Sequence, residues 1–170
     1  MSAESVHIRA MTAADVDRVL EIQSELPSAP HWGRQAWVDA FDLGAAPRRI
    51  ALVAVEMPGA SAAPQNCGEI FGFAVASLLP PEGELEVIAI SQERQRLGLG
   101  RLLLGALLEH VRRAGVVELL FEVRASNLAA MGLYREFGFR QVGSRAGYYA
   151  NPVEDAMLMR LELGSVPGRE

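Results

Sequence analysis

Two glycines one residue apart, Gly98 and Gly100, mark the stretch of this sequence best suited to bind a charged group. They close the run Gln95-Arg96-Leu97-Gly98-Leu99-Gly100, which lies between an apolar strand-like run and an apolar helix-like run. Because glycine has no Cβ, the backbone can turn tightly there and leave its N–H groups accessible. A helix beginning at this turn adds unpaired N–H donors and the positive end of its dipole. The sequence therefore predicts an anion site, and a phosphate group is a common occupant of such a site.

Two glutamates on expected strands are candidate proton acceptors. Alternation along the first of these strands places Glu122 on the face opposite Leu119, Phe121 and Val123. A carboxylate in so apolar a run costs free energy unless it is paired or its pKa rises. Glu122 is therefore the first candidate base, and an ion pair with Arg124 or another arginine is the alternative. Glu86, which shares a strand face with Glu84, is the second candidate, and a solvated strand start is its alternative.

These residues need a scaffold, and the apolar pattern predicts an α/β fold with one mixed central sheet flanked by about four helices. Strands are expected at residues 6–9, 50–55, 70–79, 85–90, 116–123, 139–149 and 156–163. Helices are expected at residues 12–26, 33–41, 100–114 and 127–137. The helix at 100–114 joins strands 85–90 and 116–123, which should be parallel neighbours. Ligands in such sheets bind outside the carboxyl ends of the strands.

The connections follow from local residue types. Thr12 is expected to cap the first helix, with Asp15 in the position of a capping box. Residues 57–68, which are rich in Pro, Gly, Ala and Ser, and residues 80–83 are expected to be hairpin connections. The 170 residues are expected to form one domain over residues 5–163, with a frayed tail at 164–170.

Composition and charge exclude several functions. A net charge of −5 and a pI near 5.3 argue against broad nucleic-acid binding. Positive charge is instead local, since Arg94, Arg96 and Arg101 surround the glycine turn, which suits a small polyanion; a solvated helix start is the alternative. Cys67 is the only cysteine, so no intrachain disulfide is possible, and a cytoplasmic location is favoured. No apolar run reaches the roughly 18 residues of a membrane span, and the N-terminus lacks an apolar signal core.

The glycine turn does not fit two common phosphate loops. A dinucleotide-binding loop has the pattern G-x-G-x-x-G/A, but the third position here is Leu103. The G-x-x-x-x-G-K-S/T loop is also absent. The pattern that matches is Q/R-x-x-G-x-G/A between a strand and a long helix. It resembles the coenzyme A pyrophosphate loop of the GNAT superfamily of N-acetyltransferases.

Three further segments resemble the same superfamily, and together the resemblance covers roughly residues 5–163. Residues 84–90 look like the strand before the loop. Residues 122–139 are similar to the segment E-V-R-x-x-N-x-x-A-x-x-L-Y-x-x-x-G-F. Tyr148-Tyr149 with residues 154–156, and more loosely residues 30–32, resemble the branch that acetylates the N-terminal alanine of a ribosomal protein.

The resemblance implies acetyl-coenzyme A as cosubstrate and gives each site residue a role. Glu122 would be the base, with Glu86 as its rival, and Tyr134 the acid that protonates the coenzyme thiolate; a core aromatic is the alternative for Tyr134. Asn127 would cap its helix and contact the pantetheine arm. The backbone of strand 88–90 would pair with pantetheine amides like an added strand. The residues implied to bind the coenzyme are Ile88, Ala89, Ile90, Gln95, Arg96, Leu97, Gly98, Leu99, Gly100, Arg101 and Asn127.

The favoured acceptor is the N-terminal α-amine of a protein. Its reference pKa of about 7.7–8.0, against about 10.4 for lysine, lets a carboxylate working through a water complete its deprotonation near neutral pH. The resemblance implies the N-terminal alanine of the eighteenth small-subunit ribosomal protein. A small-molecule amine or a lysine is the second hypothesis. A non-catalytic coenzyme A-binding regulator is the third, and the presence of both Glu122 and Tyr134 argues against it.

Four side chains are candidates for the acceptor groove: Tyr148, Tyr149, His31 and Trp32. Core or rim packing is the alternative for each of them. His31 has no metal-ligand spacing to the other histidines, so no metal is expected. The long segment 57–68 and Gly132, inside the helix of Tyr134, depart from the branch pattern and leave the acceptor less defined than the cofactor.

Overall fold

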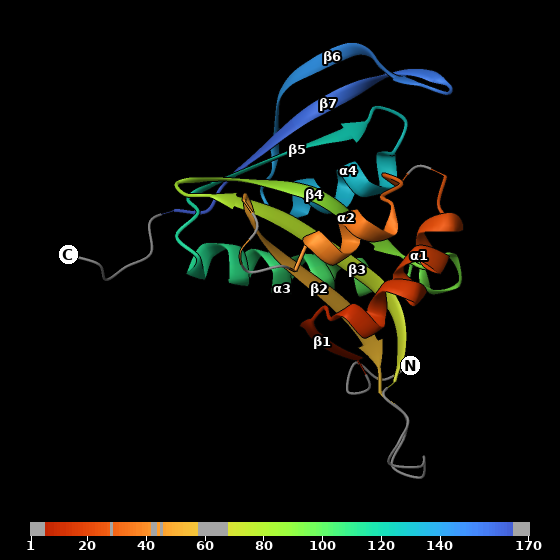
Figure 1. The fold of residues 1–170 in the computed structure, drawn as a ribbon. Coiled ribbons are helices and arrows are strands. Elements are labelled where there is room, and N and C mark those ends of the chain that lie inside the picture. The colour runs from red at the N-terminus through yellow and green to blue at the C-terminus, as the bar shows by residue number, and fades with distance from the viewer. Residues whose placement is uncertain (1–5, 28, 42–43, 45, 58–67, 165–170) are drawn as a thin grey trace, which may run out of the picture.

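A computed structural model describes residues 6–27, 29–41, 44, 46–57 and 68–164 of the chain (Figure 1). Most of the expected tail at 164–170 and most of the expected connection at 57–68 therefore lie outside the described residues, as does Cys67. The described strands form one seven-stranded sheet in the order β1 (Val6–Ala10), β2 (Arg48–Glu56), β3 (Glu69–Leu79), β4 (Glu82–Ile90), β5 (Glu118–Arg124), β7 (Val153–Glu162) and β6 (Arg140–Ala150). The described α-helices are α1 (Val16–Ser24), α2 (Arg34–Asp39), α3 (Leu99–Arg113) and α4 (Leu128–Glu136).

The predicted α/β class and the order of helices and strands are confirmed. The first helix differs in detail, because Thr12 begins a short 3₁₀ turn, Ala13–Asp15, that leads into α1. The Asp15 carboxylate accepts from the Thr12 backbone N–H at 2.8 Å, as the expected capping box requires, and also pairs with Arg9 at 2.7 Å. These contacts lower the pKa of Asp15 although its burial acts in the opposite direction.

One predicted connection is wrong in length. The turn expected at 80–83 is only Pro80-Pro81, because β4 already begins at Glu82, which pairs with Leu79 of β3. Proline has no N–H for a strand ladder, so the two prolines are confined to the turn while the residues after them pair normally. The strand predicted from residue 85 thus begins three residues earlier.

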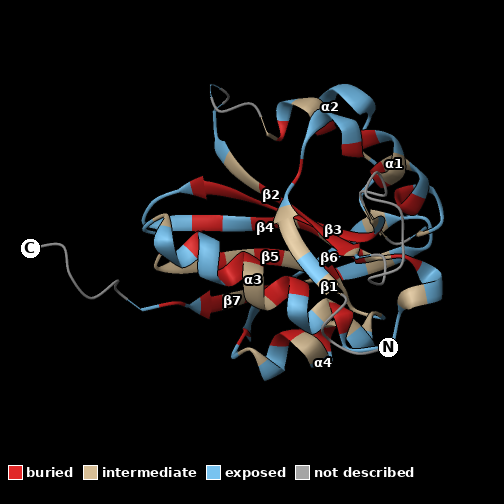
Figure 2. Ribbon diagram, turned by 90° about the horizontal axis from the view of Figure 1, so that it is seen from below, coloured by how far each residue is buried: buried red, intermediate tan, exposed pale blue. Residues whose placement is uncertain are grey.

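The sheet carries a hydrophobic core on each of its two faces (Figure 2). On one face, α3 buries the apolar stripe predicted from its spacing, which consists of Leu103, Leu104, Leu107, Leu108 and Val111. Met131 and Tyr134 of α4 belong to this core. On the other face, α1 and α2 bury Val16, Val19, Ile22 and Trp37 against the alternate residues of the same strands. None of the helices in the described part of the chain has the length and apolarity that crossing a membrane would require.

The predicted parallel pairing of β4 with β5 is confirmed, but it is short. Residues 82–84 of β4 pair with residues 118–120 of β5, and no further pairs between these strands occur in the described residues. Both strands continue, β4 to Ile90 and β5 to Arg124, and Figure 1 shows them diverging. On their other sides they remain paired, β4 with β3 and β5 with β7. The sheet is therefore split at its centre toward the carboxyl ends of these two strands.

The buried stripe of α3 should carry much of the stability of the fold. Leu107 is 0% exposed, and its replacement by alanine leaves a cavity between α3 and the sheet. We expect Leu107→Ala to lower the free energy of unfolding by about 2–5 kcal/mol in urea titrations. Leu102 on the same helix is 43% exposed, so Leu102→Ala should change it by less than about 0.5 kcal/mol. Equal losses in the two variants would contradict the assigned core.

Candidate active site

A cavity of about 540 Å³ occupies the split between β4 and β5. Its lining comes from the α1–α2 connection, from residues 84–90 of β4, from residues 121–124 of β5, and from Asn127, Tyr134, Tyr148 and Tyr149. The structure therefore brings together both predicted catalytic residues, the rival Glu86 and the strand segment Ile88–Ile90. The cavity lies at the carboxyl ends of parallel strands, where the fold class predicts a ligand.

Glu86 of β4 is held in place by Arg49 of β2. The Arg49 Nε donates to Glu86 Oε2 at 2.6 Å, and its Nη2 donates to Oε1 at 3.0 Å. The side chains are 21% and 17% exposed, so this two-bond ion pair is largely removed from water. It raises the pKa of Arg49. Both carboxylate oxygens of Glu86 thus accept hydrogen bonds from Arg49. Glu86 is therefore not the solvated strand start that the sequence left as its alternative.

Glu122 of β5 faces the same cavity and has a different partner. Arg145 Nη1 of β6 lies 2.9 Å from Glu122 Oε1. The hydroxyl of Tyr148 also hydrogen-bonds to Glu122, which raises the pKa of Tyr148. The ion pair with Arg124 that the sequence left open does not form, since Arg124 instead approaches Glu154 at 3.4 Å and lies 4.0 Å from the ring centre of Tyr149. The partner of Glu122 is Arg145, which the sequence pattern did not identify.

Glu84 is a third cavity carboxylate, and the sequence analysis did not select it. Its side chain remains accessible, yet partial burial together with the negative charges of Glu86 and Glu122 raises its pKa. Its spacing could have identified Glu84 as a cavity residue, because Glu84 and Glu86 lie two residues apart on one face of β4. The cavity therefore carries a local excess of negative charge beside its arginines.

Tyr134 of α4 is a core aromatic that also borders the cavity. It is only 6% exposed and packs with Phe121 at a ring-centre distance of 4.1 Å, as a core aromatic would. It also lines the cavity. Burial raises its pKa, so the phenol is neutral at physiological pH. The predicted cap is confirmed as well, since Asn127 Oδ1 accepts from Ala130 N at 3.2 Å and fixes the start of the same helix.

The glycine turn forms the beginning of α3, as predicted. Gly98 is its N-cap, with a φ of +76° that favours glycine. Arg101 and Leu102 are the first donors to the Gly98 carbonyl, so the N–H groups of Leu99 and Gly100 precede the helical hydrogen bonds. From this loop, Gln95 lines the cavity and donates to the Ile90 carbonyl at 3.2 Å. Residues 96–101 do not line the cavity, although they directly follow Gln95 in the sequence.

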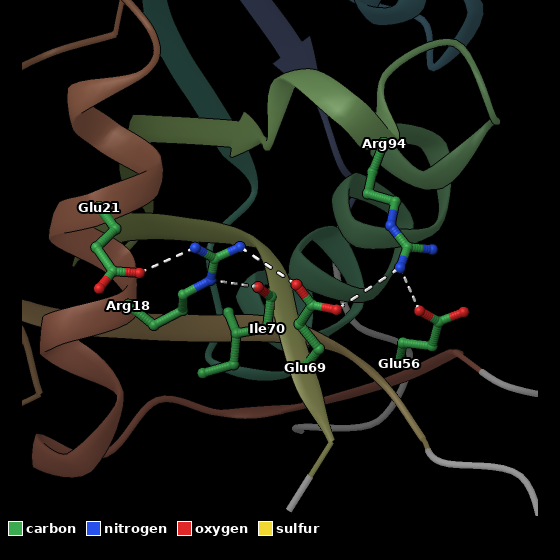
Figure 3. Close-up of polar contacts among 6 residues, drawn as sticks. All are labelled: Arg18, Glu21, Glu56, Glu69, Ile70 and Arg94. Carbon is green, nitrogen blue, oxygen red and sulfur yellow. Dashed lines mark hydrogen bonds and ion pairs between the residues drawn. The ribbon is translucent and has the colours of Figure 1, made fainter.

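The basic cluster expected around the turn is smaller than predicted. Arg94 turns toward β2 and β3, where it pairs with Glu56 at 2.5 Å and with Glu69 at 3.8 Å (Figure 3). Glu69 also pairs with Arg18 of α1 at 3.5 Å. Its carboxylate therefore links Arg94, which precedes the glycine turn, to α1. Arg101 forms an ion pair with Glu136 of α4. Arg96 is exposed and adopts a φ of +62°.

The candidates for the acceptor groove separate into two groups. His31, Tyr148 and Tyr149 line the cavity. Trp32 does not, because it packs on Trp37 with ring centres 4.8 Å apart and its backbone N–H donates to Gln23 Oε1 at 2.9 Å. Within the described ranges, no group of three or more His, Cys, Asp or Glu side chains is arranged to hold a metal ion.

Two sequence relatives are similar to this chain over much of its length. N-alpha-acetyltransferase RimI of Mycobacterium tuberculosis is 38% identical over 165 residues, which cover 95% of both chains. The [ribosomal protein bS18]-alanine N-acetyltransferase of Escherichia coli is 40% identical over 98 residues, or 56% of this chain. That match spans 66% of the Escherichia coli enzyme, just under two thirds of its length.

Solved structures share the fold. The crystal structure of the ribosomal-protein-S18-alanine N-acetyltransferase from Escherichia coli superposes with a TM-score of 0.78 at 28% identity, over 97% of both chains. The structure of yncA from Salmonella typhimurium with its cofactor acetyl-CoA gives 0.75 at 22% identity, over 97% of this chain and 98% of that one, and shows the fold alone. The model of the acetyltransferase (GNAT) family matches residues 19–139. With the split sheet and the glycine turn in place, the chain belongs to the acetyltransferase (GNAT) family.

Proposed function

We propose that the protein transfers the acetyl group of acetyl-coenzyme A directly to an amine, and that the amine is the N-terminal α-amine of a protein. The observation that carries this proposal is the cavity between β4 and β5, which holds Glu122 and Tyr134 beside the glycine turn. The GNAT family uses acetyl-coenzyme A. A relative that matches 95% of this chain is named an N-alpha-acetyltransferase.

The residues around the split fit the coenzyme. Beyond Glu84, one edge of β4 has no partner strand among the described residues, so backbone groups of Ile88–Ile90 can pair with pantetheine amides. The N–H groups at the start of α3 can hold the pyrophosphate, as helix N-termini do for phosphates in general. Residues 95–101 would form this part of the site, and Asn127 would contact the pantetheine arm. The bound coenzyme would supply the thioester carbon that the amine attacks.

Proton transfer is assigned to Glu122 and Tyr134. Glu122 accepts the proton of the attacking amine through a water, and Tyr134 donates its hydroxyl proton to the departing thiolate and regains one from solvent. The raised pKa of Tyr134 keeps that proton on the phenol until the thiolate forms. Glu86 is disfavoured as the base because both of its oxygens are bonded to Arg49.

The proposed acceptor is the N-terminal alanine of the eighteenth small-subunit ribosomal protein, on which the Escherichia coli relative acts by its name. Three carboxylates in the cavity favour a cationic acceptor group over an anionic one. His31, Tyr148 and Tyr149 would contact the acceptor at the rim.

A peptide panel tests the acceptor class. Peptides with a free N-terminus, including the N-terminal sequence of the ribosomal protein, are compared with N-blocked peptides that carry lysine and with small amines. We expect acetylation of the free α-amines only, because their lower pKa leaves more of the neutral amine near pH 7.5. Intact mass identifies the product. Modification confined to the lysine peptides or the small amines would reject the proposed acceptor.

Replacing each glutamate with its amide tests the base. At saturating acetyl-coenzyme A, we expect Glu122→Gln to lower kcat by about 10²–10⁴-fold, the usual contribution of a general base. Both variants are measured across one pH range. Glu86→Gln should lower kcat by less than about tenfold, because the Glu86 carboxylate is engaged in its ion pair with Arg49. Unchanged turnover in Glu122→Gln would remove it as the base, and a larger loss in Glu86→Gln would transfer the role to that residue.

A valine at the glycine turn tests the coenzyme site. Gly98 and Gly115 flank opposite ends of α3, both have positive φ, and neither has a neighbour within 4 Å of an added Cβ. Gly98→Val and Gly115→Val should therefore strain the backbone similarly. We expect only Gly98→Val to weaken coenzyme A binding in calorimetry, by about tenfold or more, since its side chain blocks the approach of phosphate to the N–H groups. Equal affinity in the two variants would reject this phosphate site.

A further inference from the structure

The two arginine–glutamate pairs of the cavity are built differently. Arg49 and Glu86 are both mostly buried and share two hydrogen bonds. In the second pair Glu122 is 18% exposed but Arg145 is 60% exposed, and Arg145 Nη1 lies 2.9 Å from Glu122 Oε1. An exposed ion pair contributes little to stability, so the second pair is poorly explained as a device that holds the fold together.

The Arg145 side chain lies on the face of the sheet that carries Glu122, because Arg145 pairs with Ala156, which also pairs with Arg124, two residues from Glu122. An irregularity follows Arg145 in β6. Arg145 pairs with Ala156 of β7 and Tyr149 pairs with Glu154, so four steps along β6 match two along β7. The extra residues form a bulge at residues 146–148, which Gly147 permits through a φ of +62°. The Gly147 N–H is fixed by Asp155 Oδ1 at 2.9 Å.

The bulge allows Tyr148 to approach the carboxylate that Arg145 contacts. In a regular strand, residues three apart point to opposite faces. Here Arg145 and Tyr148, three apart, both bond to Glu122, and the guanidinium lies 5.6 Å from the ring centre of Tyr148. Such placement stiffens the arginine against the ring as well as against the carboxylate.

We propose that Arg145 is a positioning residue that holds the Glu122 carboxylate in place to accept the proton of the acceptor amine through a water. This inference rests on the proposed role of Glu122 as the base. A base must keep its geometry to within a fraction of an ångström, and a misplacement of about 1 Å can cost about 10²-fold in rate. Nearby Glu84 and Glu86 would otherwise repel the Glu122 carboxylate, so the arginine also counters that repulsion.

The test compares Arg145→Gln with Arg140→Gln. Arg140 lies on the same strand, is 73% exposed and pairs with Glu162 at 3.1 Å, away from the cavity lining. We expect Arg145→Gln to lower kcat by about tenfold, with the KM for acetyl-coenzyme A and the unfolding midpoint unchanged. Arg140→Gln should change none of these quantities. Arg145→Lys, which keeps a cation near Oε1, should restore most of kcat.

A double-mutant cycle shows whether Arg145 acts through Glu122. In the Glu122→Gln background, Arg145→Gln should have no further effect on residual turnover, because the group it positions is gone. An equal tenfold loss in both backgrounds would overturn the inference, as would a change confined to the KM of the acceptor. The single variant Glu122→Gln tests the proposed base itself, so unchanged turnover in Glu122→Gln would remove Glu122 as the base, whereas additive effects would reject only the role of Arg145.

Discussion

The structure depends on the early end of the parallel pairing between β4 and β5. Three residue pairs join the strands, after which both continue without further pairing to each other in the described part of the chain. The crossover helix α3 forces the strands to be neighbours, while separate partners, β3 and β7, hold them as they diverge. The divergence creates the cavity, leaves backbone groups of β4 available and places β4, β5 and α4 residues around one space. Because α3 begins just after β4, the same geometry brings its N-terminal N–H groups to the end of the split.

The arginines that pair with the cavity glutamates come from β2 and β6, each two positions away in the sheet from the strand of its glutamate. Arg49 reaches Glu86 from β2, and Arg145 reaches Glu122 from β6. Carboxylates withdrawn from water are costly without such partners. Each half of the sheet thus supplies the counter-ion for its own glutamate, and the two ion pairs face one another across the gap. The two pairs differ in the exposure of their arginines, which is 21% for Arg49 and 60% for Arg145.

Regular elements and the glycine turn could be predicted from the sequence because periodicity and local conformational preference determine them. The stripe from Leu103 to Val111, the cap at Asn127 and the position of Gly98 all follow from spacing within a few residues. Contacts that depend on distant strands could not be predicted. Arg94 lies close to the turn in sequence, but its partner Glu56 is 38 residues away. Tyr148 approaches Glu122 from within a bulge, because an unbulged β6 would point Arg145 and Tyr148 to opposite faces.

Open strand edges usually lie at the margin of a sheet, where they invite pairing with other chains. In this fold, the edge of β4 that lacks a partner beyond Glu84 lies inside the sheet. The α1–α2 connection and the paired tyrosines of β6 border it. The backbone N–H and C=O groups of this edge, which could promote aggregation at the margin of a sheet, are therefore kept in an interior position. The protein can preserve a ready-made recognition surface through folding and storage without presenting it to the strands of other proteins.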